Sequence, residues 1–438
     1  MKFRTITGSL ALLLAFLSTP ALAFSGDALH GANTSWVLTA TALVLFMTLP
    51  GLALFYGGLV RSRNVLSVLM QCFAIASGVS ILWLLGFYSL AFTDGGSAQP
   101  YIGGFGRALM LGVTPEVLQD GLPEIAFAGF QMTFAVITPA LVVGGFAERM
   151  RFSSVLVFSM LWTLCVYVPV CHWVWGGGFL GELGLLDFAG GTVVHITAGV
   201  AALVSAIVLG KRKGFPQTPM PPHNMTMTVV GAGMLWVGWY GFNGGSALSA
   251  GGSAAMAMFV THISASSGAL AWILLERIKY GKPSVLGAVT GMVAGLGTIT
   301  PASGHVGPLA GLVIGVTAGA VCFWATGVIK HRLHIDDSLD VFPVHGVGGI
   351  LGTLLVGVFA SPALGAFSGY GYGSGVASMG HQLVVQGLGV AVTIIYTGAL
   401  TFALLKLVGW VLGGLRVNDE EEALGLDLSY HGERGYDL

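Results

Sequence analysis

Apolar runs of about 20 residues, the length that crosses a bilayer, recur along the whole chain. They constrain the fold more than any other feature, because a segment in lipid must satisfy its own backbone N–H and C=O groups. Composition agrees: charged residues make up 8% of the chain, against about 25% in an ordinary soluble protein. The sequence predicts an all-α polytopic membrane protein.

After Ser35 we predict eleven transmembrane helices. Their approximate limits are 36–60, 65–92, 125–147, 153–174, 192–210, 225–243, 254–276, 284–300, 304–329, 342–360 and 380–411. The loops after spans one, three, five, seven and nine carry Arg61, Arg63, Arg149, Arg151, Lys211, Arg212, Lys213, Arg277, Lys279, Lys282, Lys330 and Arg332, and the alternate loops carry only Arg107. Since basic residues collect on the cytoplasmic side, the N-terminus is predicted outside and the C-terminus inside.

The first 23 residues have the pattern of a cleaved signal peptide. Lys2 and Arg4 precede an apolar core over 10–17, which is too short for a transmembrane helix, and Ala21-Leu-Ala23 fits a cleavage site. We therefore expect a signal peptide over 1–23, a membrane domain over 24–412 and a cytoplasmic tail over 413–438. The composition of that tail favours solvation or disorder.

An odd number of spans per unit predicts an inverted repeat of spans 1–5 and 6–10. Each unit then ends in an acid, a phenylalanine and a histidine that begins a glycine-rich span: Asp187 to His195 in one and Asp340 to His345 in the other. Inverted repeats place their shared site near the midplane. For the two histidines to meet there, both helix starts must be recessed into the membrane.

Ionisable residues inside a membrane span are costly, so His195 and His345 call for a function. Two facing neutral imidazoles share one hydrogen bond and still offer polar edges to a small guest. The alternative is two unrelated histidines bonded to backbone. A metal site is disfavoured, because no third ligand lies at helical spacing.

Asp187 stands just before the fifth span. It can cap the free N–H groups of that helix, or it can supply negative charge to a cation or accept a proton. Both interpretations stay open at this point.

Aromatic residues cluster in three places: Phe130 and Phe134, then Trp175, then Phe242 close to Ser246. A Trp face attracts a desolvated cation by about 2 kcal/mol, although single interfacial Trp residues are commonly membrane anchors. The four cysteines lie in apolar segments without metal-ligand spacing and are interpreted as buried thiols. We find no motif for a nucleotide, metal or redox cofactor, for an enzyme, or for nucleic-acid binding.

The chain resembles a bacterial ammonium transporter of the ammonium transporter/Rh superfamily. The segment from Asp187 to His195 and the Ile-Thr-Ala-Gly after it is similar to the family signature. Four further motifs support it: Phe146-Ala-Glu-Arg-Met-Arg-Phe-Ser153, Gly241-Phe-Asn-Gly-Gly-Ser246, Thr300-Pro-Ala-Ser-Gly and Phe342-Pro-Val-His345-Gly. The resemblance extends from about Ser35 to Gly432.

This resemblance implies a role for each candidate residue. Trp175, Phe130 and Ser246 match an outer site that recruits ammonium. Phe134 and Phe242 match a pair of rings that closes the pore, and His195 and His345 match the twin histidines that line it. Asp187 matches an aspartate of structural and electrostatic role. Trp175 and Ser246 favour the ammonium transporter branch over the Rh branch.

The expected function is transport of ammonium or ammonia across the cytoplasmic (inner) membrane. A bare cation is costly to move through an apolar channel, whereas ammonia is neutral. Ammonium recruited outside and deprotonated there could pass, and potassium could not. The alternatives are an electroneutral ammonia gas channel and an ammonium sensor. Methylammonium is a candidate second substrate.

The resemblance also implies partners. The family forms homotrimers with one pore per subunit, and a short tail such as 413–438 contacts a PII-family nitrogen signal protein together with the cytoplasmic loops. A sensor is expected to carry a signalling domain after the last span, so sensing by this chain would be indirect, through such a PII partner.

Overall fold

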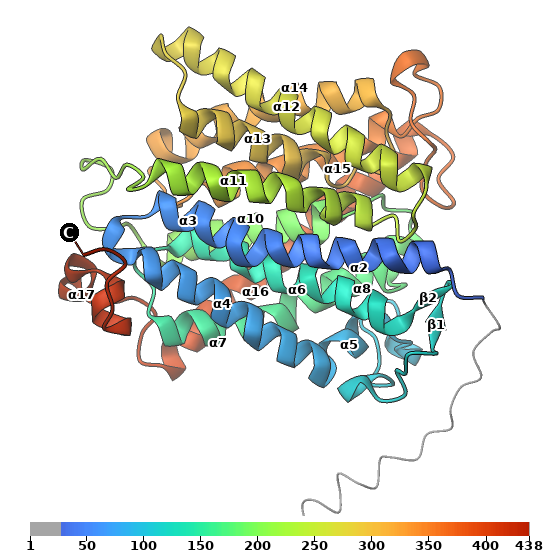
Figure 1. The fold of residues 1–438 in the computed structure, drawn as a ribbon, viewed down its shortest axis with the longest axis horizontal. Coiled ribbons are helices and arrows are strands. Elements are labelled where there is room, and N and C mark those ends of the chain that lie inside the picture. The colour runs from blue at the N-terminus through green and yellow to red at the C-terminus, as the bar shows by residue number, and fades with distance from the viewer. Residues whose placement is uncertain (1–27, 438) are drawn as a thin grey trace, which may run out of the picture.

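The computed structural model describes residues 28–437, so the predicted signal peptide over 1–23 lies outside the described residues. Long helices run side by side through the molecule, and their connecting loops gather at two opposite ends (Figure 1). We call the end that carries residues 413–437 the tail side, and the opposite end the far side.

The first five predicted spans each coincide with helical segments. In chain order these segments are α2 (Gly31–Phe46), η1 (Met47–Leu52) and α3 (Ala53–Leu59); α4 (Val65–Leu82), η3 (Trp83–Phe87) and α5 (Tyr88–Phe92); α6 (Glu124–Phe146); α7 (Phe152–Trp162), η6 (Thr163–Tyr167) and α8 (Val168–Trp175); and η7 (Gly191–Ile196) and α10 (Thr197–Leu209). In these spans each η segment is a turn of π-helix within a longer helix.

The remaining six predicted spans also coincide with helical segments. These are α11 (Met225–Trp239) and η8 (Tyr240–Gly244); α12 (Gly252–Tyr280); α13 (Val285–Ile299); α14 (Pro308–Gly327) and η9 (Val328–Arg332); η10 (Phe342–Gly346) and α15 (Val347–Phe359); and α16 (Met379–Val411). Here too the η segments are π-helical turns.

Short elements connect the spans or follow the last one. They are η2 (Ser62–Asn64), η4 (Gly96–Ala98), η5 (Ala108–Met110), β1 (Leu118–Gln119), β2 (Leu122–Pro123), α9 (Phe179–Glu182), η11 (Gly365–Phe367), α17 (Asp419–Leu424) and η12 (Asp427–His431). The two strands pair antiparallel in the loop before α6, at the far side (Figure 1).

Nine helices within residues 28–437 are long and apolar enough to cross a membrane. The predicted spans 225–243 and 284–300 are not among these nine, and α13 is a shorter apolar helix of 15 residues. The chain is an all-α polytopic membrane protein. Its four cysteines are free, and three of them are buried.

The two halves of the bundle pack on each other reciprocally. Helix α10 contacts η10, while α15 contacts η7. A Cβ on Gly199 would lie 2.3 Å from the Cα of Gly346, and a Cβ on Gly349 would lie 2.9 Å from the carbonyl oxygen of Gly191. Small residues let helices approach this closely in lipid, and the reciprocity fits the predicted inverted repeat.

The tail is ordered on the tail side, contrary to what its composition favoured. Asn418 and Glu421 form a capping box at the start of α17. Farther along, Asp427 accepts hydrogen bonds from the backbone N–H groups of Leu66 and Ser67, at the start of α4. Burial raises the pKa of Asp427, and backbone N–H donors offset part of this. Composition did not predict that the tail is ordered, because the polar groups of the tail bond to loops that are distant in the sequence.

Buried ion pairs join the loops whose basic residues predicted the orientation of the chain. Glu148 pairs with Arg61 and Arg212, at 2.9 Å each, and Arg212 also pairs with Asp336 at 2.8 Å. Burial alone would raise the pKa of Glu148, but Arg212 and Arg61 hold it below its usual value. The basic pattern that predicted orientation therefore also ties the tail-side loops together.

Candidate functional site

A vestibule opens on the far side, with a cavity volume of about 330 Å³. Its wall includes Phe127, Gln131, Phe134, Trp175 and Ser246. Aromatic faces with few polar groups suit a small cation that has lost much of its water. Two of the three residues predicted to recruit a substrate, Trp175 and Ser246, thus lie in the wall of the same cavity.

Hydrogen bonds fix both of these side chains. The indole N–H of Trp175 donates to the carbonyl oxygen of Asp187 at 2.8 Å, so the ring cannot swing away without losing that bond. The Ser246 hydroxyl donates to the carbonyl oxygen of Phe242 at 2.8 Å. Since its single proton is used there, the Ser246 oxygen has only acceptor capacity left for a guest. An acceptor suits a cation that carries N–H groups.

Phe130, the third predicted recruitment residue, does not line the vestibule. It is fully buried and packs edge-on against Phe134, with ring centroids 5.0 Å apart. Its ring also contacts the backbone at Gly245, where a Cβ would lie 2.8 Å from it. Phe130 supports the wall from behind, whereas Gln131 reaches the surface of the vestibule.

Phe134 and Phe242 close the inner end of the vestibule. Their ring centroids lie 4.3 Å apart, and both side chains are fully buried. Trp175 packs edge-on against Phe134 at 5.8 Å, and the His195 ring lies 6.1 Å beyond Phe242. The two phenyl rings therefore stand between the vestibule and the histidines.

His195 and His345 meet in the interior of the bundle. Their Nδ1 atoms are 3.2 Å apart, and the rings are nearly parallel. His195 begins a span that ends on the tail side, where the carbonyl oxygen of Leu209 accepts from Arg416. The span of His345 runs the opposite way. It starts on the tail side, soon after Asp336, whose carboxylate accepts a hydrogen bond from Arg212. Both helix starts are thus recessed, as the contact required.

The shared hydrogen bond sets the protonation pattern of a neutral pair. One ring must donate at Nδ1 and so accepts at Nε2, while its partner accepts at Nδ1 and so donates at Nε2. The Nε2 atom of His195 is buried and has no hydrogen-bond partner. The pair can therefore offer one donor and one acceptor to a small polar molecule.

Apolar side chains surround the histidines. The adjoining cavity has a volume of only about 10 Å³, and its wall is aliphatic and aromatic apart from the two rings. Trp239 stacks on His195 with centroids 5.5 Å apart, and its indole N–H donates to the Thr300 hydroxyl. This narrow apolar surrounding disfavours a charged guest far more than a neutral one.

Three of these residues lie on π-helical turns. His195 is on η7, Phe242 on η8 and His345 on η10. A π-turn adds a residue to the helical turn and re-aims the side chains around it, and such turns are frequent at functional sites. Apolar periodicity gave no sign of them, because one extra residue per turn hardly alters the pattern.

Asp187 caps the start of η7. Its two carboxylate oxygens accept from the backbone N–H groups of Gly190, Gly191, Thr192 and Val193 and from the Thr192 hydroxyl. Five donors saturate the carboxylate. The geometry agrees with the capping interpretation, and the orientation of the His195 helix start depends on this one side chain.

The repeat partner of Asp187 is Asp337, and the predicted pairing with Asp340 is wrong. Asp337 accepts from the backbone N–H of Phe342 at 2.7 Å and so caps η10. It precedes His345 by eight residues, the same spacing that separates Asp187 from His195. That equal spacing was the available signal. Asp340 instead adopts a left-handed backbone, with φ of 60°, and turns toward Lys330.

Asp337 differs from its counterpart in one respect. Its Oδ1 atom is buried without a hydrogen-bond partner. Burial, followed by the neighbouring charge of Asp340, raises the pKa of Asp337 to about 7. The tail-side cap is therefore a weaker acid than an ordinary aspartate.

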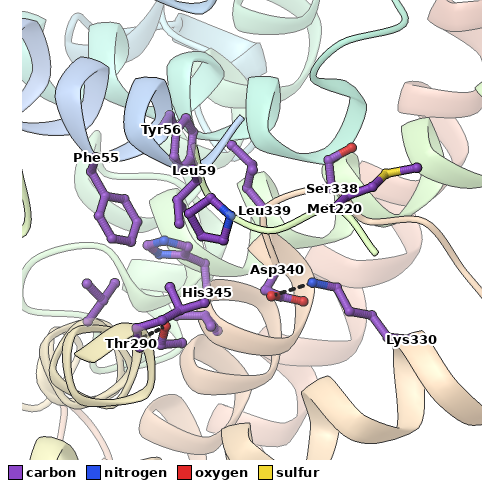
Figure 2. A pocket seen from close by; sticks show the side chains of 14 residues that line it. Phe55, Tyr56, Leu59, Met220, Thr290, Lys330, Ser338, Leu339, Asp340 and His345 are labelled. Carbon is purple, nitrogen blue, oxygen red and sulfur yellow. Dashed lines mark hydrogen bonds and ion pairs between the residues drawn. The ribbon is translucent and has the colours of Figure 1, made fainter. Parts of the chain in front are cut away.

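A second cavity, of about 80 Å³, lies on the tail side of His345 (Figure 2). Tyr56 and Thr290 belong to its wall, and Lys330 donates to Asp340 across it at 2.7 Å. His345 thus lines both this cavity and the narrow interior one. Sequence reasoning singled out neither Lys330 nor Asp337 for the site.

Within residues 28–437 no group of three or more His, Cys, Asp or Glu side chains is placed to hold a metal ion. The two histidines offer two nitrogen ligands at most. From the far side to the tail side, the vestibule, the narrow apolar cavity beside the histidines and the tail-side cavity follow one another.

Comparison with known proteins agrees with this arrangement. The model of the Ammonium Transporter Family matches residues 35–436. The chain belongs to the ammonium transporter family. It is 48% identical over 397 residues to an ammonium transporter of Bacillus subtilis, covering 90% of this chain and 96% of that protein. It is 45% identical over 433 residues to an ammonium transporter of Aquifex aeolicus, covering 98% and 99%.

Solved structures support the same membership. The crystal structure of Saccharomyces cerevisiae Mep2 superposes on this ammonium transporter family member with a TM-score of 0.82 at 36% identity, covering 90% of this chain and 88% of that one. A structure described as a sensor Amt protein gives a TM-score of 0.84 at 30% identity, covering 91% and 98%. The relatives from Bacillus subtilis and Aquifex aeolicus are transporters by name, and this family member is not an enzyme.

Proposed function

We propose that this protein transports ammonium or ammonia across the cytoplasmic membrane, with the far side outside and the tail side in the cytoplasm. Ammonium is recruited in the far-side vestibule between the Trp175 face and the Ser246 oxygen. It is deprotonated there, and ammonia passes Phe134 and Phe242 to the paired histidines. Methylammonium, with N–H groups and one positive charge, is a second substrate candidate.

The observation that supports this proposal best is the 3.2 Å contact of His195 with His345 inside an apolar surrounding. A buried donor and acceptor cost little when a small polar molecule satisfies them. Potassium carries a charge that it cannot give up, so the same surrounding opposes it. Ammonium can leave its proton behind. Selectivity then follows from chemistry rather than from size.

The test is transport by the reconstituted full-length protein and by His195→Ala and His345→Ala variants. We expect ammonium-evoked transport in the wild type, its loss or a change of its ion selectivity in both variants, and no change in His381→Ala. His381 is an exposed histidine at the start of α16 and serves as a matched control. Identical transport and identical potassium exclusion in all four proteins would contradict the role of the histidines.

Parallel recording of current and of ammonia flux separates the two transport modes. Current that follows ammonium indicates electrogenic transport, in which the proton crosses by another route. Ammonia flux without current indicates an electroneutral gas channel, which is the alternative mode for the same pore.

A sensing role is the second candidate, and the likeness to the sensor Amt protein favours it. We propose that this role is indirect and that a PII-family protein docks on the tail, residues 413–438, and on the neighbouring loops. The test is co-purification of the full-length protein with a PII protein from the same cell, with and without residues 413–438. Absence of binding to the full-length protein would refute it.

We also propose a homotrimer with one pore per subunit, and removal of the signal peptide after Ala23. Mass measurement of the purified protein in detergent tests the first, and N-terminal sequencing of the mature protein tests the second.

A further inference from the structure

The tail-side cavity holds an ion pair that the conduction path as described does not use. Figure 2 shows Lys330, from η9, reaching toward Asp340, with His345 in the wall of the same cavity. The Lys330 Nζ atom lies 2.7 Å from Oδ2 of Asp340. A fixed cation and a fixed anion thus stand at the tail-side mouth of the histidine pair.

Carboxylate oxygens outnumber hydrogen-bond donors at this mouth. Asp337 and Asp340 are close enough for the charge of Asp340 to contribute to the raised pKa of Asp337. The Oδ1 atoms of both are buried without a hydrogen-bond partner. Lys330 engages only Oδ2 of Asp340, so one oxygen on each carboxylate has no donor.

The two buried arginines near this loop are engaged elsewhere. Arg212 pairs with Asp336 and Glu148. Arg149 donates to the Ser338 hydroxyl and to the carbonyl oxygen of Asp336. The hydroxyl of Tyr56, from α3, donates to the carbonyl oxygen of Leu141 at 3.0 Å. Lys330 is thus the cation bonded to the Asp340 carboxylate among the described residues.

A purely structural role explains this pair poorly. The side chains of Lys330 and Asp340 are 25% and 20% exposed, and a pair so accessible to water contributes little to folding. Asp340 also holds a left-handed backbone that is unfavourable for a residue with a side chain. Strain of this kind persists where the surroundings impose it, which is often at a site.

We propose that Lys330 is a tethered cation that occupies the Asp340 carboxylate and thereby keeps monovalent cations of the tail side out of the pore. The inference rests on the proposed conduction of ammonia or ammonium. Without the lysine, the carboxylate would attract potassium or ammonium to the mouth next to His345. With it, that place is filled by a cation that cannot enter, while neutral ammonia passes without hindrance.

The experiment is inhibition of ammonium transport by potassium in proteoliposomes that contain the full-length protein, with equal potassium on both sides. Symmetric potassium makes the insertion direction irrelevant. We expect Lys330→Met to lower the potassium concentration for half-inhibition by about three- to fivefold, as loss of a partly exposed ion pair allows. Lys330→Arg keeps the charge and should behave as the wild type does.

The double variant Lys330→Met/Asp340→Asn decides whether the carboxylate is the cause. We expect it to return potassium sensitivity to the wild-type level. Unchanged sensitivity in Lys330→Met overturns the proposal, and so does raised sensitivity that survives in the double variant. Thermal melting of each purified variant shows whether it is folded.

Direct binding of radiolabelled methylammonium to the purified full-length protein is a second measurement that does not need conduction. The proposal is supported if Lys330→Met binds methylammonium more tightly than the wild type does and the double variant binds it as the wild type does. Equal binding in all three overturns it. A wild type that binds but moves neither ammonium nor ammonia refutes the proposed function instead, so the two failures are distinguishable.

Discussion

At the scale of single residues, the two helix-capping aspartates receive different numbers of hydrogen bonds. Asp187 receives five hydrogen bonds at the far side, whereas Asp337 caps η10 with one oxygen unpartnered. Burial, followed by the charge of Asp340, raises the pKa of Asp337 to about 7. The inverted repeat thus conserves the position of the cap but not the number of donors that it receives.

We expect Asp187→Asn to lower both thermal stability and ammonium transport. The amide nitrogen that replaces one carboxylate oxygen would place its own N–H donors against backbone N–H groups that this oxygen now satisfies. Loss of such a cap lowers the free energy of unfolding by about 0.5–2 kcal/mol. Melting temperature and transport rate of the purified protein are the measurements. Asp120→Asn, at an exposed turn of the far side, is the matched control and should change neither. Full transport by Asp187→Asn would show that the charge is dispensable.

Asp337 should make stability depend on pH. Its folded pKa of about 7 lies above the usual value of 3.8, so the folded protein holds a proton that the unfolded chain releases. Stability is therefore lost as pH rises from about 4 to 7, by roughly 4 kcal/mol at most. In Asp337→Asn this loss should vanish.

The measurement is the melting temperature of both proteins between pH 5 and 8. The difference in favour of Asp337→Asn should widen up to about pH 7 and stay constant above it. A difference that does not vary with pH would show that Asp337 is ionised throughout.

At the scale of elements, the site depends on two short helix starts pressed against opposite helices. Apolar runs predicted the spans, and the presence of His195 and His345 in them predicted that both helix starts are recessed into the membrane. The depth of each start was not predictable, because it depends on close glycine contacts between segments far apart in the sequence. The π-helical turns were not predictable either, because one extra residue per turn hardly alters the apolar pattern. Phe130 shows the same limit: the family resemblance implied a residue of the outer site, but packing places its ring behind the vestibule wall.

We expect the substitution Gly199→Ala to push α10 and η10 apart. Its new Cβ would lie 2.3 Å from the Cα of Gly346, and because backbone cannot yield as a side chain can, η10 must shift and carry His345 with it. We expect a loss of about 1–3 kcal/mol of stability and strongly reduced transport.

Gly233→Ala is the matched control for this substitution. It lies in α11, where nothing stands within 4 Å of an added Cβ, so it should be neutral or slightly stabilising. Melting temperature and transport of both variants check the expectation, and wild-type transport by Gly199→Ala would contradict the close approach as a requirement.

At the scale of the whole molecule, the tail connects to the loops that follow spans one and five. Glu422 is 1% exposed, accepts from the backbone N–H of Lys213 and pairs with Arg416 at 2.7 Å. Asp427 meanwhile caps α4. A docking partner on the tail would therefore act on the loop that precedes His345, through Arg212 and Asp336.

We expect Glu422→Ala to release the tail. The Arg416 side chain is 30% exposed, so the loss should be about 1–3 kcal/mol, between the values for exposed and buried pairs. Limited proteolysis should then cleave residues 413–437 faster than in the wild type. Glu420→Ala, an exposed acid on the same helix, should leave cleavage unchanged. Equal cleavage of both variants would mean that the tail is held by Asp427 instead.

The sequence by itself determined the membrane class, the eleven helical segments and the presence of two histidines inside apolar spans. Apolar length, basic loops and the position of each histidine are properties of single segments, so they are readable without a structure. Tertiary structure alone decided that Asp337 and not Asp340 is the partner of Asp187, that Lys330 pairs with Asp340 beside His345, and that the tail is ordered. Each of these depends on which groups meet across distant segments, and a carboxylate in a sequence does not say which donors will reach it.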